Sequence, residues 1–198
     1  MKDFYYGNDA YAKRGLLNYS YPIERGTIEN FDHFEKLIDY AFTNELRIEA
    51  SDYPVHMTES LQTSAKSREH LLKYFFETLD VPRFYISGQA LLSVYATGAT
   101  TGLAIEMGDG VTQIVPVSGG FTLKHASQKI DLAGRDVTSF LNDIIYLGNH
   151  NINSYASYEI TREMKEKLCR VSMDYDNEIQ EWSPRMVDGQ VVIYNYFI

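Results

Sequence analysis

The apolar positions of this chain follow helical spacing in some segments and strand spacing in others. Apolar residues recurring every three or four positions predict helices over residues 31–46, 64–79, 90–96, 137–145 and 157–173. Asn30 or Asp32 is available to cap the first helix, and Gly98 ends the third. Short runs rich in β-branched or alternating apolar residues predict strands over residues 16–21, 54–58, 83–86, 103–105, 111–117, 128–132 and 190–194. Because helices and strands alternate, the expected class is α/β.

The second predicted helix shows how the pattern selects a buried face. Its apolar residues are Leu71, Leu72, Phe75, Phe76 and Leu79, which we expect on one side of the helix. Glycine-containing pairs mark turns elsewhere, at Arg25-Gly26 and at Gly119-Gly120.

The stretch from Gly98 to Asp136 organises the rest of the chain. A strand leads through Glu106 into a Gly108-Asp109-Gly110 turn, and a second strand follows from Val111. Two glycines permit positive φ, so that backbone N–H groups point inward and cradle an anion. An Asp-Gly pair between strands is equally a signal for a plain hairpin, and on the pattern alone the hairpin is favoured.

Composition narrows the functional classes. A length of 198 residues suits one or two domains, and 16 tyrosines with 10 phenylalanines indicate a folded chain. The net charge of −9 argues against a general nucleic-acid or anionic-membrane binder. A lone Cys169 excludes an internal disulfide, and no run is apolar enough to span a bilayer, so a cytoplasmic location is expected. The five histidines have no metal-ligand spacing.

Several collinear motifs identify a family. They are Lys13-Arg14-Gly15, Tyr21-Pro22-Ile23-Glu24, Phe76-Glu77-Thr78 with Val81-Pro82, the run Gln89 to Gly98, Gly108 to Thr112, Asp131 to Asp136, and Lys165 to Cys169. Together they make the chain resemble actin over nearly its whole length. The resemblance implies an actin-like ATPase fold of the ribonuclease H-like type, incomplete, with parts of both lobes present.

The resemblance also divides the chain. It implies that residues 1–21 are a remnant of actin subdomain 2, residues 22–96 part of subdomain 1, residues 97–132 part of subdomain 3 and residues 133–198 part of subdomain 4. The first phosphate loop and the C-terminal region of actin have no counterpart in the sequence given. The remaining strands would therefore have open edges, and we expect the chain to aggregate, to repack or to have those edges covered by a partner.

A nucleotide site follows from the same resemblance. It implies that Gly108, Asp109, Gly110 and Val111 contact the phosphates, with Asp109 also holding Mg²⁺ through water. Gln89 matches the glutamine that positions the attacking water. On the nucleoside side the implied residues are Gly134, Arg162, Lys165 and Glu166. From the sequence alone, the last three are a solvated charged helix face.

Departures from the family pattern concern hydrolysis. Glu106 stands where actin has aspartate, and a displacement of about 1 Å can cost about a hundredfold in rate. Met107 replaces a serine, and Gln113 replaces a histidine that helps to order the water. Arg25 replaces a histidine beneath the phosphates. We therefore expect at most a weak ATPase, with ATP or ADP and Mg²⁺ bound weakly or not at all by the isolated chain.

The resulting expectation is an actin-like cytoskeletal protein with a partial ATP-binding cleft and impaired or absent hydrolysis. The alternative is a non-catalytic actin-like scaffold subunit in a larger assembly, and a third interpretation is a relic without independent activity. Tyr95 and Phe121 match residues of the cleft through which actin contacts other proteins, or else are core aromatics. Protein partners or self-association are expected, without nucleic acid or membrane.

Overall fold

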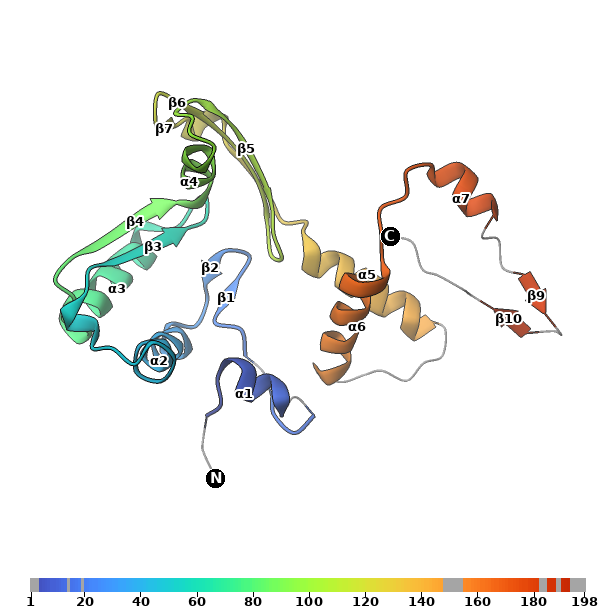
Figure 1. Cartoon of the computed structure of the whole chain (residues 1–198), viewed down its shortest axis with the longest axis horizontal. Coiled ribbons are helices and arrows are strands. Elements are labelled where there is room, and N and C mark those ends of the chain that lie inside the picture. Colours follow the sequence, from blue (N-terminus) through green and yellow to red (C-terminus); the bar gives the residue numbers. More distant parts are fainter. Residues whose placement is uncertain are drawn as a thin grey trace. The chain divides into compact units, whose positions relative to one another are not determined.

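A computed structural model describes residues 4–13, 15–18, 20–147, 155–181, 185–187 and 190–192. The chain forms two compact units, Met1–Gly134 and Arg135–Ile198, and each is described by itself (Figure 1). The first unit contains both parallel and antiparallel strands with intervening helices. The expected α/β class is therefore confirmed.

The first unit opens with a short helix, α1 (Gly7–Ala12). The strand predicted over residues 16–21 is wrong, because the described residues there form a turn, a bend and irregular structure, and Leu16 is 89% exposed. The N–H of Leu16 donates to the carbonyl of Lys13 at 2.9 Å, so this backbone bends locally. A strand needs a neighbour for its N–H and C=O groups, and none of the described strands pairs with this segment.

A tight hairpin follows, made of β1 (Ile23–Glu24) and β2 (Thr27–Ile28). Its turn residues are Arg25 with φ 45° and Gly26 with φ 72°, which is the signature of a type I′ turn. The predicted Arg25-Gly26 turn is thus confirmed. Gly26 is needed for a second reason, because a Cβ there would lie 2.6 Å from the side chain of Ser60.

A βαβ unit, made of β3, α3 and β4 and preceded by α2, forms one part of this first unit. Helix α2 (Phe31–Tyr40) is capped by Asn30, whose Oδ1 accepts from the N–H of His33 at 2.9 Å, and it continues as a π-helix over Ala41–Leu46. Strands β3 (Val55–Glu59) and β4 (Phe84–Gly88) are parallel, with Val55 opposite Phe84. The intervening helix α3 (Ala65–Lys73) extends as a π-helix over Tyr74–Thr78.

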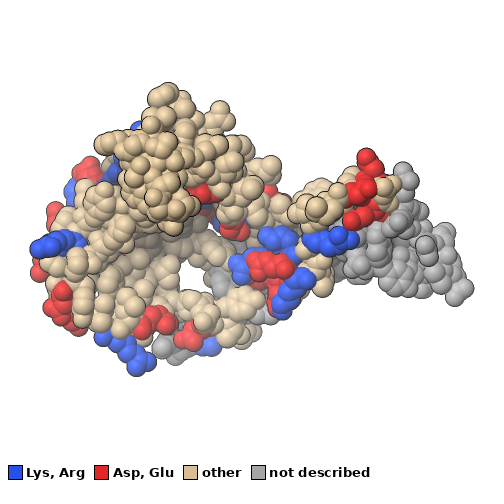
Figure 2. Space-filling model, turned by 45° about the horizontal axis from the view of Figure 1, so that its top comes forward, with Lys and Arg blue, Asp and Glu red and all other residues tan. Residues whose placement is uncertain are grey.

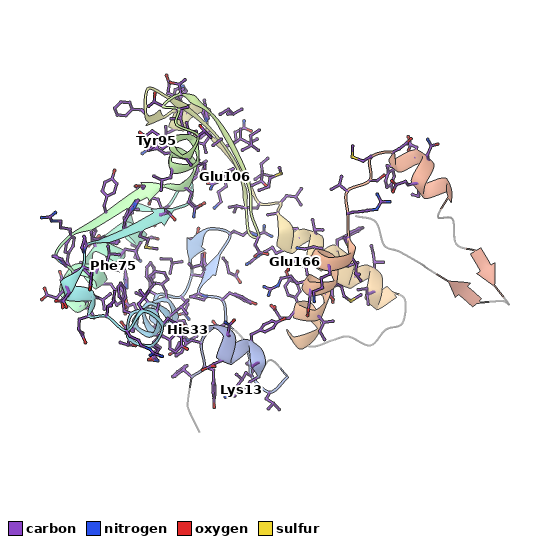
Figure 3. The ribbon with its side chains drawn as sticks, in the orientation of Figure 1. Lys13, His33, Phe75, Tyr95, Glu106 and Glu166 are labelled. Atoms are coloured by element: carbon purple, nitrogen blue, oxygen red, sulfur yellow. The ribbon has the colours of Figure 1, made fainter. Side chains whose placement is uncertain are left out.

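The helices pack on this parallel pair through a core centred on Phe75, which is 2% exposed and stacks on Phe84 at 4.2 Å (Figure 3). The predicted buried face of α3 needs correction. Leu72 and Phe76 are 42% and 44% exposed, whereas Tyr74 is buried. Residues 71, 74 and 75 share the inner face at i, i+3 and i+4, whereas Leu72 and Phe76, which follow Leu71 and Phe75, are turned about 100° toward solvent.

An ion pair fastens α3 to the end of β3. The Arg68 guanidinium donates to both carboxylate oxygens of Glu59 at 2.7 Å, and the pair raises the pKa of Arg68. Bidentate geometry fixes the angle between helix and strand as well as their separation.

The second core of this unit lies against an antiparallel sheet. Helix α4 (Gln89–Ala96) begins directly after β4, and Gly98 with φ 78° follows its end. Strands β5 (Gly102–Met107) and β6 (Thr112–Ser118) form the predicted hairpin, and β7 (Phe121–Thr122) and β8 (Gln128–Ile130) both pair with β6. The buried residues between α4 and the sheet are Ala90, Val94, Ala104, Val115 and Val117.

The second unit is mainly helical. Its elements are α5 (Gly134–Leu147), α6 (Tyr155–Leu168), α7 (Tyr175–Glu181), β9 (Arg185–Val187) and β10 (Gln190–Val192). The helix predicted to reach residue 173 ends at Leu168 instead, and a new helix begins at Tyr175, where Asp174 accepts from the N–H of Asn177. The rest of the last predicted strand, residues 193–194, lies outside the described residues. None of the helices in the described ranges is long and apolar enough to cross a bilayer.

Adjacent phenylalanines provide a test of the first core. Phe75→Ala removes a ring that is 2% exposed, and we expect it to lower the free energy of unfolding by about 3–5 kcal/mol. Phe76→Ala is the matched control, since that ring is 44% exposed, and its cost should be about 1 kcal/mol. Urea unfolding monitored by circular dichroism measures both. Equal losses would show that the core is centred elsewhere.

Candidate functional site

A cleft of about 520 Å³ lies between the parallel pair β3–β4 and the antiparallel sheet that contains β5 and β6. Polar side chains from four elements line it. They are Thr58 of β3, Gln89 and Ser93 of α4, Glu106 of β5 and Gln113 of β6, and the Gly108–Val111 turn contributes at one end. The predicted residues Gln89, Glu106, Gly108 and Val111 are thus brought together, although 24 positions separate Gln89 from Gln113 in the chain.

The side chain of Gln113 is the centre of this cleft. It is 3% exposed, and its Oε1 accepts from the N–H of Leu61 at 2.8 Å and from the Ser60 hydroxyl at 3.3 Å. Its Nε2 donates to Glu106 at 2.9 Å and to Gln89 Oε1 at 3.2 Å. Two acceptor sites and two N–H donors are all that an amide has, so every one is used. Because a backbone N–H only donates, Leu61 fixes which end of the amide is oxygen.

Glu106 and Gln89 are engaged in the same network. The Glu106 carboxylate accepts from Gln113 on one oxygen and from the Ser93 hydroxyl on the other. The Gln89 carbonyl accepts from Gln113, and its amide nitrogen lies 3.5 Å from the Thr58 hydroxyl. Both candidate catalytic side chains therefore hold protein partners at the atoms that would otherwise orient a water molecule.

The Gly108–Val111 turn closes through its own backbone. The Gly108 N–H donates to the Val111 carbonyl at 3.1 Å, and the Gly108 carbonyl accepts from the Gly134 N–H at 3.0 Å. The expectation of positive φ at its glycines is wrong, since neither Gly108 nor Gly110 is among the residues with positive φ. Of the implied phosphate donors, Gly108 already spends its N–H on the turn. The turn is thus a hairpin joined to the start of α5.

Close approach, rather than positive φ, explains the second glycine. A Cβ on Gly110 would lie 3.1 Å from the Cα of Arg25 and 3.2 Å from its nitrogen. The Arg25 guanidinium donates to the Gly110 carbonyl at 3.2 Å and to the Asp131 carbonyl at 2.9 Å. The β1–β2 hairpin therefore contacts the turn through Arg25, and the same side chain connects the turn to the segment after β8.

Charge in the cleft is predominantly negative. None of the described residues that line it is Lys or Arg, whereas Glu106 contributes a carboxylate. Asp109 is exposed on the turn, where one carboxylate suits a Mg²⁺ ion that retains its waters and takes further ligands from phosphate. No three His, Cys, Asp or Glu side chains converge on a metal-binding position in the part of the chain that the structure describes. Any magnesium here would take most of its ligands from phosphate oxygens and water rather than from protein side chains.

The residues implied for the nucleoside belong to α6 in the second unit. Arg162 Nη2 lies 2.7 Å from Glu159 Oε2, and its Nε lies 4.0 Å from Glu166 Oε1. Lys165 and Glu166 lie on the same helix, and Glu159 is only 3% exposed. This is more than a solvated charged face, because Arg162 pairs with a buried carboxylate. The role of Arg162, Lys165 and Glu166 in nucleoside binding stays a prediction.

Tyr95 and Phe121 lie away from the cleft, near the far end of the second sheet. They are 43% and 77% exposed, and the Tyr95 hydroxyl donates to the Gly120 carbonyl at 3.1 Å. The interpretation of both as core aromatics is therefore wrong. Their role in protein contact stays a prediction.

Sequence reasoning missed four members of the network: Thr58, Ser60, Leu61 and Ser93. A signal existed for Ser93, which follows Gln89 by four residues and therefore shares its helix face. No comparable signal existed for Ser60 or Leu61, which meet Gln113 across more than 50 residues of chain.

Comparison with known families agrees with the motifs. Residues 1–191 match the family model described as Actin.

Replacing the central amide tests the network directly. Gln113→Leu leaves the Leu61 N–H and one Glu106 oxygen without their partners, and we expect a loss of about 2–4 kcal/mol in the free energy of unfolding. Gln128→Leu is the control, because that glutamine is exposed on β8 of the same sheet, and it should cost less than about 0.5 kcal/mol. Chemical denaturation compares them. A neutral Gln113→Leu would contradict the network.

Proposed function

Since the chain belongs to the actin family, we propose that it is an actin-like cytoskeletal protein whose cleft binds Mg-ATP weakly and hydrolyses it slowly or not at all. The proposed phosphate contacts are the backbone of Gly110 and Val111, with Asp109 facing the water shell of the metal. Gly108 joins them only if its bond to Val111 opens.

The charge of the cleft supports weak binding. A triphosphate carries several negative charges, and the lining side chains offer Glu106 but no Lys or Arg. The guanidinium nearest to the turn, that of Arg25, donates to two backbone carbonyls. Mg²⁺ must therefore supply most of the charge neutralisation, and the free energy of binding is correspondingly small.

The network around Gln113 is the observation that carries the proposal of impaired hydrolysis. In-line attack needs a group that accepts a hydrogen bond from water in the reacting geometry. The Gln89 carbonyl and both Glu106 oxygens each accept a hydrogen bond from a neighbouring side chain, which fixes their orientation and leaves each oxygen fewer acceptor sites for water. An amide at position 113 also lacks the protonation equilibrium of an imidazole near neutral pH, so it offers no base.

Titration of the purified chain with Mg-ATP, followed by ligand-observed NMR and a phosphate-release assay, tests this function. We expect a Kd of about 0.1–10 mM, which corresponds to roughly 3–5 kcal/mol of binding free energy, and no phosphate release above the buffer rate. Micromolar affinity or multiple turnovers would contradict the proposal. Absence of binding at 10 mM ATP, which sets a lower limit of about 10 mM on the Kd, would favour the scaffold alternative instead.

A glycine pair checks whether the turn is the phosphate site. Gly110→Ala places a methyl group 3.1 Å from the Arg25 backbone, so the turn must shift, and we expect at least a tenfold loss of ATP affinity. Gly102→Ala in the same hairpin has only an ordinary 3.6 Å contact with Val94 and should change affinity less than twofold. Circular dichroism confirms that both variants fold. Equal affinities would place the nucleotide elsewhere.

The scaffold alternative has an observation of its own. Tyr95 and Phe121 expose apolar rings on one end of the sheet, and exposed aromatics are common in protein interfaces. Figure 2 brings this end forward and shows few charged side chains there. A scaffold role predicts association with a protein that survives removal of nucleotide and is lost in Tyr95→Ala/Phe121→Ala. A nucleotide-dependent association would favour the first function.

A further inference from the structure

The Ser93 hydroxyl and the Glu106 carboxylate are arranged as a nucleophile and its base. The hydroxyl, on α4, donates to Glu106 Oε1 of β5 at 2.5 Å, and both side chains line the cleft. A serine hydroxyl is a weak nucleophile by itself and becomes an effective one when a neighbouring group accepts its proton. A carboxylate oxygen to which the hydroxyl already donates is in position to accept that proton.

Gln113 orients the carboxylate for this role. Its Nε2 donates to Glu106 Oε2 at 2.9 Å, so that Oε1 is the oxygen that faces Ser93. Gln113 is itself fixed, because it is 3% exposed and its Oε1 accepts from the N–H of Leu61. The contacts therefore run from a nucleophile to a base and from the base to a group that orients it, as they do around activated nucleophiles in enzymes.

A hydroxyl in this position has an advantage over water. Ser93 lines the same cleft as Gly108 and Val111 of the turn to which the phosphates are assigned above. Because α4 holds Ser93 in place, its hydroxyl has a high effective concentration toward a bound phosphate, provided that the reacting atoms approach to about 3–3.5 Å. A water molecule, in contrast, meets a Glu106 oxygen that already accepts from Ser93.

We propose that Ser93 is a site of autophosphorylation, at which the hydroxyl accepts the terminal phosphoryl group of Mg-ATP bound in the cleft. Ser93 Oγ forms a bond to the γ-phosphorus, the bond from that phosphorus to the β,γ-bridging oxygen breaks, and ADP leaves with the electron pair. The Ser93 proton passes to Glu106 Oε1 and from there to solvent. This inference rests on the proposed binding of Mg-ATP, with the serine hydroxyl in place of water as the attacking group.

The reaction should stop after one event per chain. A phosphoserine carries a charge of roughly −1.5 to −2 at neutral pH, and next to Glu106 it is repelled by the carboxylate. None of the described residues that line the cleft is a Lys or Arg that could offset this charge. We therefore expect ADP to form in an amount equal to that of the protein, without free phosphate, and the phosphorylated chain to bind Mg-ATP more weakly.

Incubation of the full chain with radiolabelled Mg-ATP, followed by phosphopeptide mass spectrometry, tests the site. We expect the label on Ser93, at a first-order rate that tenfold dilution of the protein leaves unchanged, since each chain modifies itself. Ser93→Ala should abolish the label. Thr97→Ala is the matched control, because Thr97 follows the end of α4 and its hydroxyl donates to the Val94 carbonyl. It should leave the labelling rate unchanged.

Glu106→Gln tests the base separately from the nucleophile. The amide can still form hydrogen bonds with Ser93 and Gln113 but does not take up the proton, so that the labelling rate should fall at least about a hundredfold. Ligand-observed NMR measures the affinity for Mg-ATP in the same variants, and we expect Ser93→Ala to change it less than threefold.

The two measurements distinguish the inference from the function on which it rests. A chain that does not bind Mg-ATP would overturn both. Binding without label, label on another residue, a rate that falls on dilution, or an unchanged rate in Glu106→Gln would overturn the autophosphorylation alone.

Discussion

Four hydrogen bonds to the buried amide of Gln113 join the parts from which the cleft is built. They connect the loop after β3, the first turn of α4 and the end of β5. The apolar cores on either side are separate clusters, one around Phe75 and one between α4 and the antiparallel sheet. Polar contacts at the cleft therefore connect the elements of the two clusters, a role that a continuous apolar core has in other folds. Their cost when broken is high, since each buried group left without a partner costs about 1–3 kcal/mol.

The network bears differently on the two parts of the proposed function, nucleotide binding and hydrolysis. The candidate catalytic side chains Gln89 and Glu106 are hydrogen-bonded to neighbouring side chains of the network. Backbone groups of the turn depend less on side-chain identity, and Arg25 holds that turn against the β1–β2 hairpin. The function proposed above, weak binding with impaired hydrolysis, rests on this difference between the backbone of the turn and the side chains of the network.

Much of the local structure could be predicted from the sequence, because its causes are local. The Asn30 cap, the turn at Arg25-Gly26 and the hairpin around Asp109 each depend on a few neighbouring residues. The failures share a different cause. Gly110 is required by the backbone of Arg25, 85 positions away, and Leu61 meets Gln113 over 52 positions. Periodicity and turn signals contain no information on such meetings. The expected strand before Pro22 failed similarly, since a strand is defined by its partner.

Hydrogen exchange at the Leu61 amide tests the central role of Gln113 most directly. Leu61 follows β3 in a loop, and its N–H is held by the side chain of Gln113 at 2.8 Å. We predict slow exchange of this amide in the unmodified chain and exchange at least tenfold faster in Gln113→Leu, with protection retained in Gln128→Leu. An amide that already exchanges freely in the unmodified chain, or one that stays protected in Gln113→Leu, would contradict the account.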